Sequence, residues 1–141
     1  MKRSASAFWR GDLKTGKGQI STDSGVLDQT PYSFSTRFES VKGTNPEELI
    51  AAAHAGCFSM ALSGQLGAAG LTADSIHTTA TATFEKLEVG WTITEMHLDV
   101  TAKVPGADKA KFDTAASNAK TGCPISRVLN AKITMDAKLE G

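Results

Sequence analysis

The chain has 141 residues, and its 15 basic and 15 acidic side chains give a formal net charge of zero. This length suits one domain with its own core, so we expect a single domain over residues 1–141. The balanced, scattered charge argues against a nucleic-acid-binding or anionic-membrane surface. No apolar run follows the basic N-terminus, so we expect no signal peptide and a cytoplasmic protein whose two cysteines are reduced or cycling.

The N-terminal part favours short strands. Residues 4–10 alternate weakly between polar and apolar and end at a Gly-Asp turn signal. Residues 18–22 and the pair 26–27 are two further strand candidates, separated by the tight turn Asp-Ser-Gly.

Residues 32–38 alternate more cleanly, with three aromatic side chains and a threonine on one face. This period of two predicts a strand on which Arg37 points away from the aromatic face. Two interpretations of Arg37 stay open, namely a solvated charge at a sheet edge and a guanidinium delivered to a functional site.

A long helix is expected to begin at Asn45, whose side chain can cap the first turn. Pro46 suits the first helical position, and Glu47 and Glu48 lie where the helix dipole favours negative charge. The following residues are almost uncharged until Gly70, a C-terminal stop signal. A helix this apolar should be buried in the protein core and not span a membrane.

Cys57 lies in the middle of this helix among small residues. Ala53 and Ala61 share its face at four-residue spacing, and Gly56 and Gly64 lie beside them. Because glycine weakens a helix interior by about 1 kcal/mol relative to alanine, two glycines suggest close approach by another backbone. The alternative for Cys57 itself is a small hydrophobic residue at a tight helix crossing.

The C-terminal half predicts two long strands, over residues 76–89 and 91–104, joined by a turn at Gly90. A helix should start at Asp108, and residues 121–129 should form a break and a short second helix before a last strand at 131–139. The packing stripe expected for the first of these helices consists of Phe112, Ala115, Ala116 and Ala119. This order of elements predicts an α+β fold with antiparallel sheets.

Cys123 stands in Gly-Cys-Pro, directly before a proline that can open a helix. Oriented amides at a helix N-terminus stabilise a thiolate, so Cys123 is predicted to be the more reactive thiol. Cys57, inside an apolar helix, would need a cation such as Arg37, which Glu47 or Glu48 could orient. A thiolate, a guanidinium and a second thiol are the groups that a peroxide-reducing protein requires.

Other uses of cysteine and histidine fit the pattern less well. His54, His77 and His97 show no metal-ligand spacing with each other or with a cysteine, so we expect no zinc site and no cofactor. His54 could pair with Cys57 on one helix face, as in a cysteine hydrolase, but no oxyanion-binding device is evident. The glycine-rich residues 11–18 lack the phosphate-loop pattern and are interpreted as a turn.

Several segments together resemble the OsmC/Ohr family of osmotically inducible and organic-hydroperoxide-resistance proteins, and its OsmC branch most closely. They are NPEELI at residues 45–50, AHAGCFSMAL at residues 53–62 and GCPIS at residues 122–126. Residues 25–27 and 34–39 extend the likeness along the whole chain.

The resemblance implies a cofactor-free thiol-dependent peroxidase (a peroxiredoxin-like antioxidant of the stress response) that prefers organic hydroperoxides to hydrogen peroxide. It implies that Cys57 is the peroxidatic cysteine, that Cys123 resolves it as a disulfide, and that Arg37 and Glu47 are the activating pair. This order reverses the ranking of the two thiols given above, and the family's order is adopted. Arg10 is the alternative to Arg37, since branches of the family place their arginine on different segments.

The resemblance also implies an intertwined homodimer, with antiparallel sheets packed around long central helices, and a dithiol reductant such as a lipoylated protein. Helix geometry adds an expectation of its own. Glu47 and Cys57 are separated by about 15 Å of helical rise and by roughly 80° around the axis. One straight helix cannot bring both into one pocket, so we expect two composite sites at the interface of a two-fold dimer.

A second function class remains as the alternative. The same fold could serve as a non-enzymatic protein that binds an apolar, lipid-like ligand in a cavity near Cys57. Such a protein would show no turnover, and its binding would be indifferent to both cysteines. The paired thiols favour the peroxidase, because a binding pocket does not require them.

Overall fold

The computed structural model describes residues 1–140, which form an α+β structure with two three-stranded sheets. The chain divides into two compact units, Met1–Leu49 and a second unit that begins at Ile50. Each unit contains one of the sheets. The expectation of a single domain stays a prediction.

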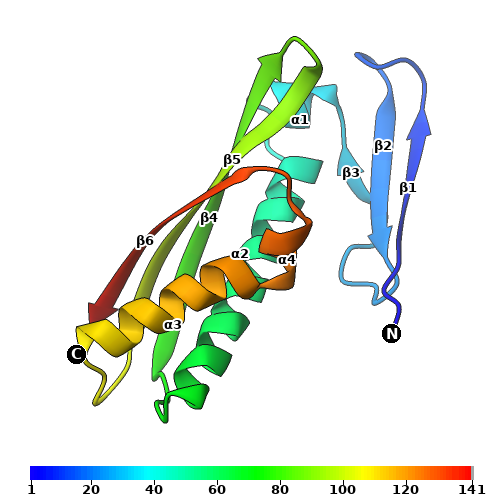
Figure 1. Ribbon diagram of the computed structural model, residues 1–141. Coiled ribbons are helices and arrows are strands. Elements are labelled where there is room, and N and C mark those ends of the chain that lie inside the picture. Colours follow the sequence, from blue (N-terminus) through cyan, green and yellow to red (C-terminus); the bar gives the residue numbers. More distant parts are fainter. Residues whose placement is uncertain (141) are drawn as a thin grey trace. The chain divides into compact units, whose positions relative to one another are not determined.

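The first unit contains the antiparallel sheet β1-β2-β3, formed by β1 (Ala5–Arg10), β2 (Lys17–Thr22) and β3 (Thr30–Tyr32) (Figure 1). The strand predicted at residues 26–27 is wrong, because this pair lies in the loop between β2 and β3. The Thr22 amide donates to the Leu27 carbonyl at 2.9 Å, which closes the loop on itself and leaves Val26 exposed.

Residues 32–38 do not form the predicted strand. Their second part is the short helix α1 (Phe34–Phe38), which begins at Ser33. A capping box forms there, since the Ser33 hydroxyl accepts from the Thr36 amide and the Thr36 hydroxyl accepts from the Ser33 amide. Phe34 and Phe38, one helical turn apart, pack with ring centroids 4.8 Å apart. Residues 32–38 thus fit both the period of a strand and that of a helix, and the capping box at Ser33 favours the helix.

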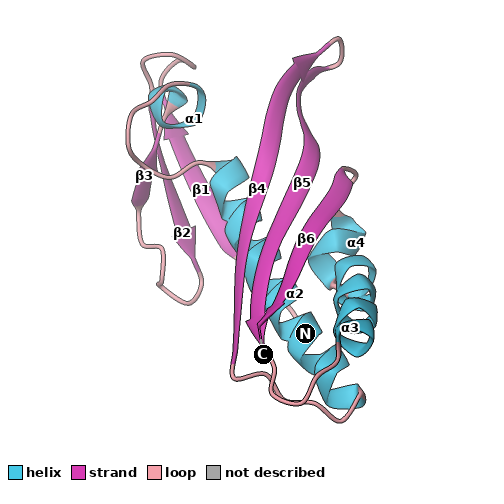
Figure 2. Cartoon of the chain, turned by 90° about the vertical axis from the view of Figure 1, so that its left-hand side faces the viewer, coloured by secondary structure: helices cyan, strands magenta, loops and turns pink. Residues whose placement is uncertain are grey.

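The second unit contains a sheet in the order β4-β5-β6, formed by β4 (Ser75–Leu87), β5 (Gly90–Lys103) and β6 (Lys132–Glu140) (Figure 2). β4 and β5 form the predicted antiparallel hairpin. β6, however, runs parallel to β5, so the expectation of purely antiparallel sheets is wrong. The two helices between β5 and β6 form the long crossover that a parallel pair needs.

Three helices accompany this sheet, and their ends follow the capping signals of the sequence. The helix α2 (Pro46–Ala68) starts after Asn45, whose side-chain oxygen accepts from the Glu48 amide at 2.8 Å. The helix α3 (Lys109–Gly122) is capped by Asp108, which accepts from the Lys111 amide at 2.7 Å. The helix α4 (Pro124–Val128) follows directly, with its proline in the first turn.

The core of the second unit lies between the sheet and the helices α2 and α3, which cover one face of it (Figure 2). The predicted packing stripe of α3 is confirmed, because all four of its members are buried. α2 and β5 complete the core with Phe58, Leu62, Leu66, Leu98, Val100 and Ala102.

The burial of α2 is one-sided, in contrast to the expectation of a buried helix. By length and composition α2 could span a membrane, as core helices of soluble proteins also could, and 22% of its most apolar window is buried. Met60 is 79% exposed, and a Cβ added at Gly56 or Gly64 would meet no atom of the described chain within 4 Å. An apolar face of α2 therefore lacks a packing partner within the residues that the structure describes.

We predict that Leu62→Ala lowers the free energy of unfolding by about 2–5 kcal/mol, because it leaves a cavity at a fully buried position. Leu87→Ala is the matched control at a position that is 44% exposed, and it should cost well under half as much. Urea unfolding measures both. Equal losses for the two variants would contradict the assigned core.

Candidate functional site

The two cysteines, 66 residues apart in sequence, meet in the second unit. The Sγ atoms of Cys57 on α2 and Cys123 at the start of α4 lie 3.0 Å apart and share a hydrogen bond. Both are free thiols. Cys123 is fully buried, whereas Cys57 is half-buried. Two sulfur atoms at this distance need only a small shift to form a disulfide on oxidation.

Cys123 is the N-cap residue of α4, as the Gly-Cys-Pro motif predicts. Its sulfur accepts a hydrogen bond from the Ser126 amide at 3.5 Å. Burial alone would raise the pKa of the Cys123 thiol, but hydrogen bonds from Cys57 and from the Ser126 amide outweigh it and leave this pKa below its ordinary value. Cys123 is therefore held in surroundings that favour a thiolate.

The surroundings of Cys57, in contrast, disfavour the thiolate. Burial raises the pKa of its thiol above the ordinary value, and the hydrogen bond with Cys123 raises it further. The backbone amide of Ile125 lowers this pKa but does not compensate. These surroundings disfavour the Cys57 thiolate unless a cation lies close to the sulfur.

Arg37 and Glu47 form an ion pair in the first unit. The guanidinium Nη2 lies 2.7 Å from Glu47 Oε1, and Nε lies 3.0 and 3.2 Å from the two carboxylate oxygens. Glu47 is buried, so its negative charge requires a paired cation to be stabilised, and Arg37 is that cation. The Arg37 side chain itself is 36% exposed. Glu48 accepts instead from the Thr44 hydroxyl at 3.2 Å. Of the two glutamates that the sequence left open, Glu47 therefore orients Arg37.

The alternative arginine has a different environment. Arg10 lies on β1, where its guanidinium stacks over the Phe8 ring at 5.6 Å from the centroid. The hydrogen bonds to Glu47 come from Arg37. A fixed orientation of the guanidinium by a buried carboxylate thus belongs to Arg37, not to Arg10.

A pocket of about 260 Å³ opens beside Arg37 within the first unit. Apart from Arg37 and Ser33, its lining is aromatic or aliphatic: Trp9, Leu13, Tyr32, Phe34 and Phe38. A pocket of this size and lining suits a small apolar group held next to a cation.

The helix α2 carries one member of each pair, since Glu47 lies in its first turn and Cys57 near its middle. α2 is continuous from Pro46 to Ala68. The rise of a regular helix therefore separates the backbones of Glu47 and Cys57 by about 15 Å. The Arg37–Glu47 pair thus belongs to the first unit and the pair of thiols to the second.

The structure adds His54 and Ser126, to which sequence reasoning gave no such role. His54 is fully buried on α2, and its Nε2 lies 2.7 Å from the hydroxyl oxygen of Ser126 on α4. The cysteine-hydrolase hypothesis required His54 to pair with Cys57, but its hydrogen bond goes to Ser126. The signal available in the sequence was spacing, because His54 precedes Cys57 by three residues and Ser126 follows Cys123 by three.

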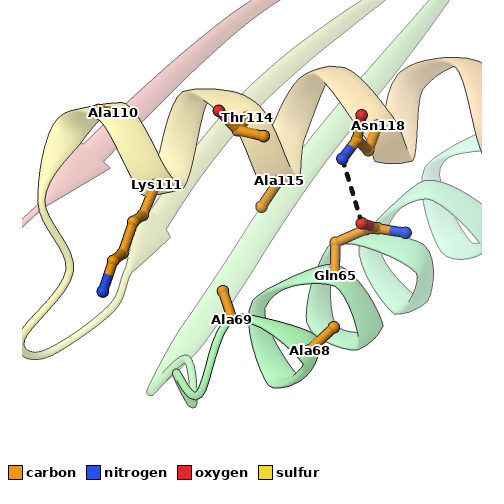
Figure 3. Close-up of a pocket in the computed structure, with 8 residues that line it drawn as sticks. All are labelled: Gln65, Ala68, Ala69, Ala110, Lys111, Thr114, Ala115 and Asn118. Atoms are coloured by element: carbon orange, nitrogen blue, oxygen red, sulfur yellow. Dashed lines mark hydrogen bonds between the residues drawn. The ribbon is translucent and has the colours of Figure 1, made fainter.

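A second cavity, of about 390 Å³, lies between the C-terminal end of α2 and the helix α3 (Figure 3). Four of its eight lining residues are alanines, and Lys111, Thr114 and the pair Gln65–Asn118, joined by a hydrogen bond of 3.4 Å, supply the polar part. Neither cysteine lines it. Within residues 1–140, no three histidine, cysteine or acidic side chains gather as a metal site would require.

Comparisons with known proteins show which family this chain is similar to. The family model described as "OsmC-like protein" matches residues 39–138. The Escherichia coli protein named "Peroxiredoxin OsmC" is 57% identical over 134 residues, which cover 95% of this chain and 94% of that protein. The Bacillus subtilis "Organic hydroperoxide resistance protein OhrB" is 29% identical over 124 residues. These residues cover 87% of this chain and 88% of that protein.

Solved structures share the fold. An OsmC-like protein of unknown function from Vibrio cholerae superposes with a TM-score of 0.78 at 16% identity. The alignment covers 97% of this chain and 99% of that one. At this identity the likeness establishes the α+β fold alone.

We predict that acid destabilises the protein partly through His54. Burial holds the pKa of this imidazole below its ordinary value of 6.5, so the unfolded chain binds a proton that the folded chain does not. Stability should therefore decrease as the pH falls from the unfolded value through the folded one. The dependence should be weaker in His54→Gln, in which nothing titrates at this position.

Urea midpoints of both proteins between about pH 7.5 and pH 5 measure this difference, because the other histidines are common to both. Parallel curves for wild type and variant would show that His54 does not contribute.

Proposed function

The chain belongs to the OsmC family, and we propose that it is a thiol-dependent peroxidase that reduces organic hydroperoxides and, more weakly, hydrogen peroxide. The observation that carries this proposal is the 3.0 Å approach of the Cys57 and Cys123 sulfur atoms. Two free thiols at this distance can give up two electrons and become one disulfide. The names of the E. coli and B. subtilis relatives support the same chemistry.

In the first step the Cys57 thiolate attacks one oxygen of the O–O bond. A sulfur–oxygen bond forms, the O–O bond breaks, and the alkoxide leaves as an alcohol after taking up a proton. Cys57 is then a sulfenic acid. Its exposure supports this assignment, because Cys57 is only partly buried and so more accessible to a hydroperoxide than the fully buried Cys123.

In the second step the Cys123 thiolate attacks the oxidised sulfur of Cys57. The disulfide forms, the sulfur–oxygen bond breaks, and hydroxide leaves as water. The hydrogen bond from the Ser126 amide supports Cys123 in this role, since it favours the thiolate at the moment of attack. An external dithiol, for which a lipoylated protein is one candidate, would return both cysteines to thiols in the cytoplasm.

Activation of Cys57 is assigned to Arg37, oriented by Glu47. The raised pKa of Cys57 must be lowered by a cation before the first step, and an arginine held by a buried carboxylate is suited to this. The apolar pocket beside Arg37 would then hold the organic part of the hydroperoxide, which accounts for a preference over hydrogen peroxide.

We further propose a homodimer in which each site is composite. Because about 15 Å of continuous helix separates Glu47 from Cys57, the Arg37–Glu47 pair that serves one Cys57 comes from the second copy. The apolar face of α2 supports this arrangement, since Met60 is exposed and the glycines Gly56 and Gly64 have open space for close approach. The intertwined form of the dimer, with single-domain subunits, belongs to the same proposal.

Cys57→Ser should abolish turnover of cumene hydroperoxide in the presence of a dithiol, because no sulfenic acid can form. Cys123→Ser, treated with peroxide in the absence of a dithiol, should form the Cys57 sulfenic acid with the first equivalent and sulfinic acid with a second, but no disulfide, since its sulfenic acid cannot resolve within the chain. Peroxide consumption and intact mass follow both variants.

Unchanged turnover in Cys57→Ser would refute the peroxidase proposal. If cumene hydroperoxide were bound without turnover by wild type and by both variants, the apolar-ligand-binding alternative would hold instead.

Arg37→Met should lower kcat/KM for cumene hydroperoxide about 10- to 100-fold, the loss expected for one charge-assisted hydrogen bond. It should also move the acid limb of the pH–rate profile to higher pH, because Cys57 loses its cation. The composite site is tested with a heterodimer of one Cys57→Ser subunit and one Arg37→Met subunit, purified through two different tags.

In that heterodimer one site has the wild-type Cys57 of one subunit and the wild-type Arg37 of the other. We expect about half of the wild-type activity per dimer, since one of two sites is complete. Activity no higher than that of the Arg37→Met homodimer would show that Arg37 serves the cysteine of its own chain.

A further inference from the structure

The helix α4 is short and weakly anchored by apolar contacts. It has five residues, and none of them is buried. A helix of this length is not stable by itself, so its position depends on the contacts that it makes with neighbouring elements. The position of α4 nevertheless determines the position of one thiol, because Cys123 is the N-cap of this helix and the Ser126 amide donates to the Cys123 sulfur.

Two side-chain contacts between α2 and α4 are arranged in register. Cys57 meets Cys123 at 3.0 Å between the sulfur atoms, and His54 Nε2 meets Ser126 Oγ at 2.7 Å. His54 lies three residues before Cys57 and so shares its helix face. Ser126 lies three residues after Cys123, in the same first turn of α4. Together the two contacts define the orientation of α4 against α2 more closely than either contact would alone.

His54 is well suited to a fixed position and poorly suited to acid–base work. It is fully buried, and its Nδ1 has no hydrogen-bond partner in the described chain. Burial holds the pKa of the ring low, so the imidazole is neutral and forms its bond with Ser126 without a buried charge. Its hydrogen bond joins it to the residue whose amide faces Cys123, not to a sulfur atom.

We infer that His54 and Ser126 are positioning residues that set how fast Cys123 resolves the sulfenic acid of Cys57. The inference rests on the proposed peroxidase function and adds a separate claim about its second step. Their hydrogen bond holds α4 so that the Cys123 sulfur faces Cys57 while the Ser126 amide faces the Cys123 sulfur. When the bond is lost, the sulfenic acid lives longer and a second hydroperoxide oxidises it to sulfinic acid, releasing a second molecule of alcohol.

The test measures how oxidised Cys57 partitions between disulfide and sulfinic acid. Wild type, Ser126→Ala and His54→Phe are treated with increasing cumene hydroperoxide, and intact mass gives the amounts of both products. Loss of one hydrogen bond should lower the ratio of disulfide to sulfinic acid about threefold to tenfold. The rate of peroxide consumption in the first turnover should fall by less.

Conservative variants and a matched control separate positioning from general damage. Ser126→Thr keeps the hydroxyl, and His54→Gln places an amide near the position of Nε2, so both should recover part of the wild-type ratio. Thr134→Val removes the same kind of bond elsewhere, since the Thr134 hydroxyl lies 2.7 Å from His97 Nδ1. This control should leave the partition ratio unchanged.

The outcomes distinguish this inference from the proposed function. If wild type forms neither disulfide nor sulfinic acid on Cys57, the peroxidase proposal itself fails. If wild type reacts but Ser126→Ala and His54→Phe keep its ratio, only the positioning role is overturned. An equal fall in both steps, or no recovery in Ser126→Thr and His54→Gln, would likewise overturn it.

Discussion

The chemistry proposed for this protein depends on the contact between two sulfur atoms that lie 66 residues apart in the sequence. Their 3.0 Å separation joins the long helix α2, which carries Cys57, to the short helix α4, which begins after Cys123. α2 fixes Cys57 because Phe58, Leu62 and Leu66 anchor the helix in the core of the second unit. Cys123 caps α4, so the same local geometry that starts this helix supplies amides to the sulfur.

The two thiols are unequal, and their differences divide the proposed work between them. Cys123 has the lower pKa but is fully buried, whereas Cys57 is accessible but needs an external cation. Helix backbone amides thus support the resolving thiol, and the oriented guanidinium of Arg37 is left for the attacking one. Helix length then favours a second copy of the chain as the source of that guanidinium, since rise along α2 separates Glu47 from Cys57.

Local signals made much of this structure predictable. The cap at Asn45 and the stripe on α3 were correct because each involves neighbours in sequence. Helix α1 was missed because residues 32–38 fit a period of two, although the Ser33–Thr36 capping box carried the opposite signal. The parallel pairing of β6 with β5 was missed because strand direction depends on the crossover, which no local pattern encodes.

Part of the candidate site was also predictable from the sequence. Glu47 and Arg37 were expected to pair, and their ion pair is present. Ser126 had no recognised role, because its contact with His54 spans 72 residues and no spacing rule links them. Long-range side-chain contacts of this kind arise only once the helices are packed.

The most direct test of the central claim is peptide mapping of the peroxide-treated protein without reduction. One equivalent of cumene hydroperoxide per chain should convert the peptides of Cys57 and Cys123 into a single disulfide-linked pair within one chain. Unlinked peptides, or a link that joins two chains instead, would contradict the account.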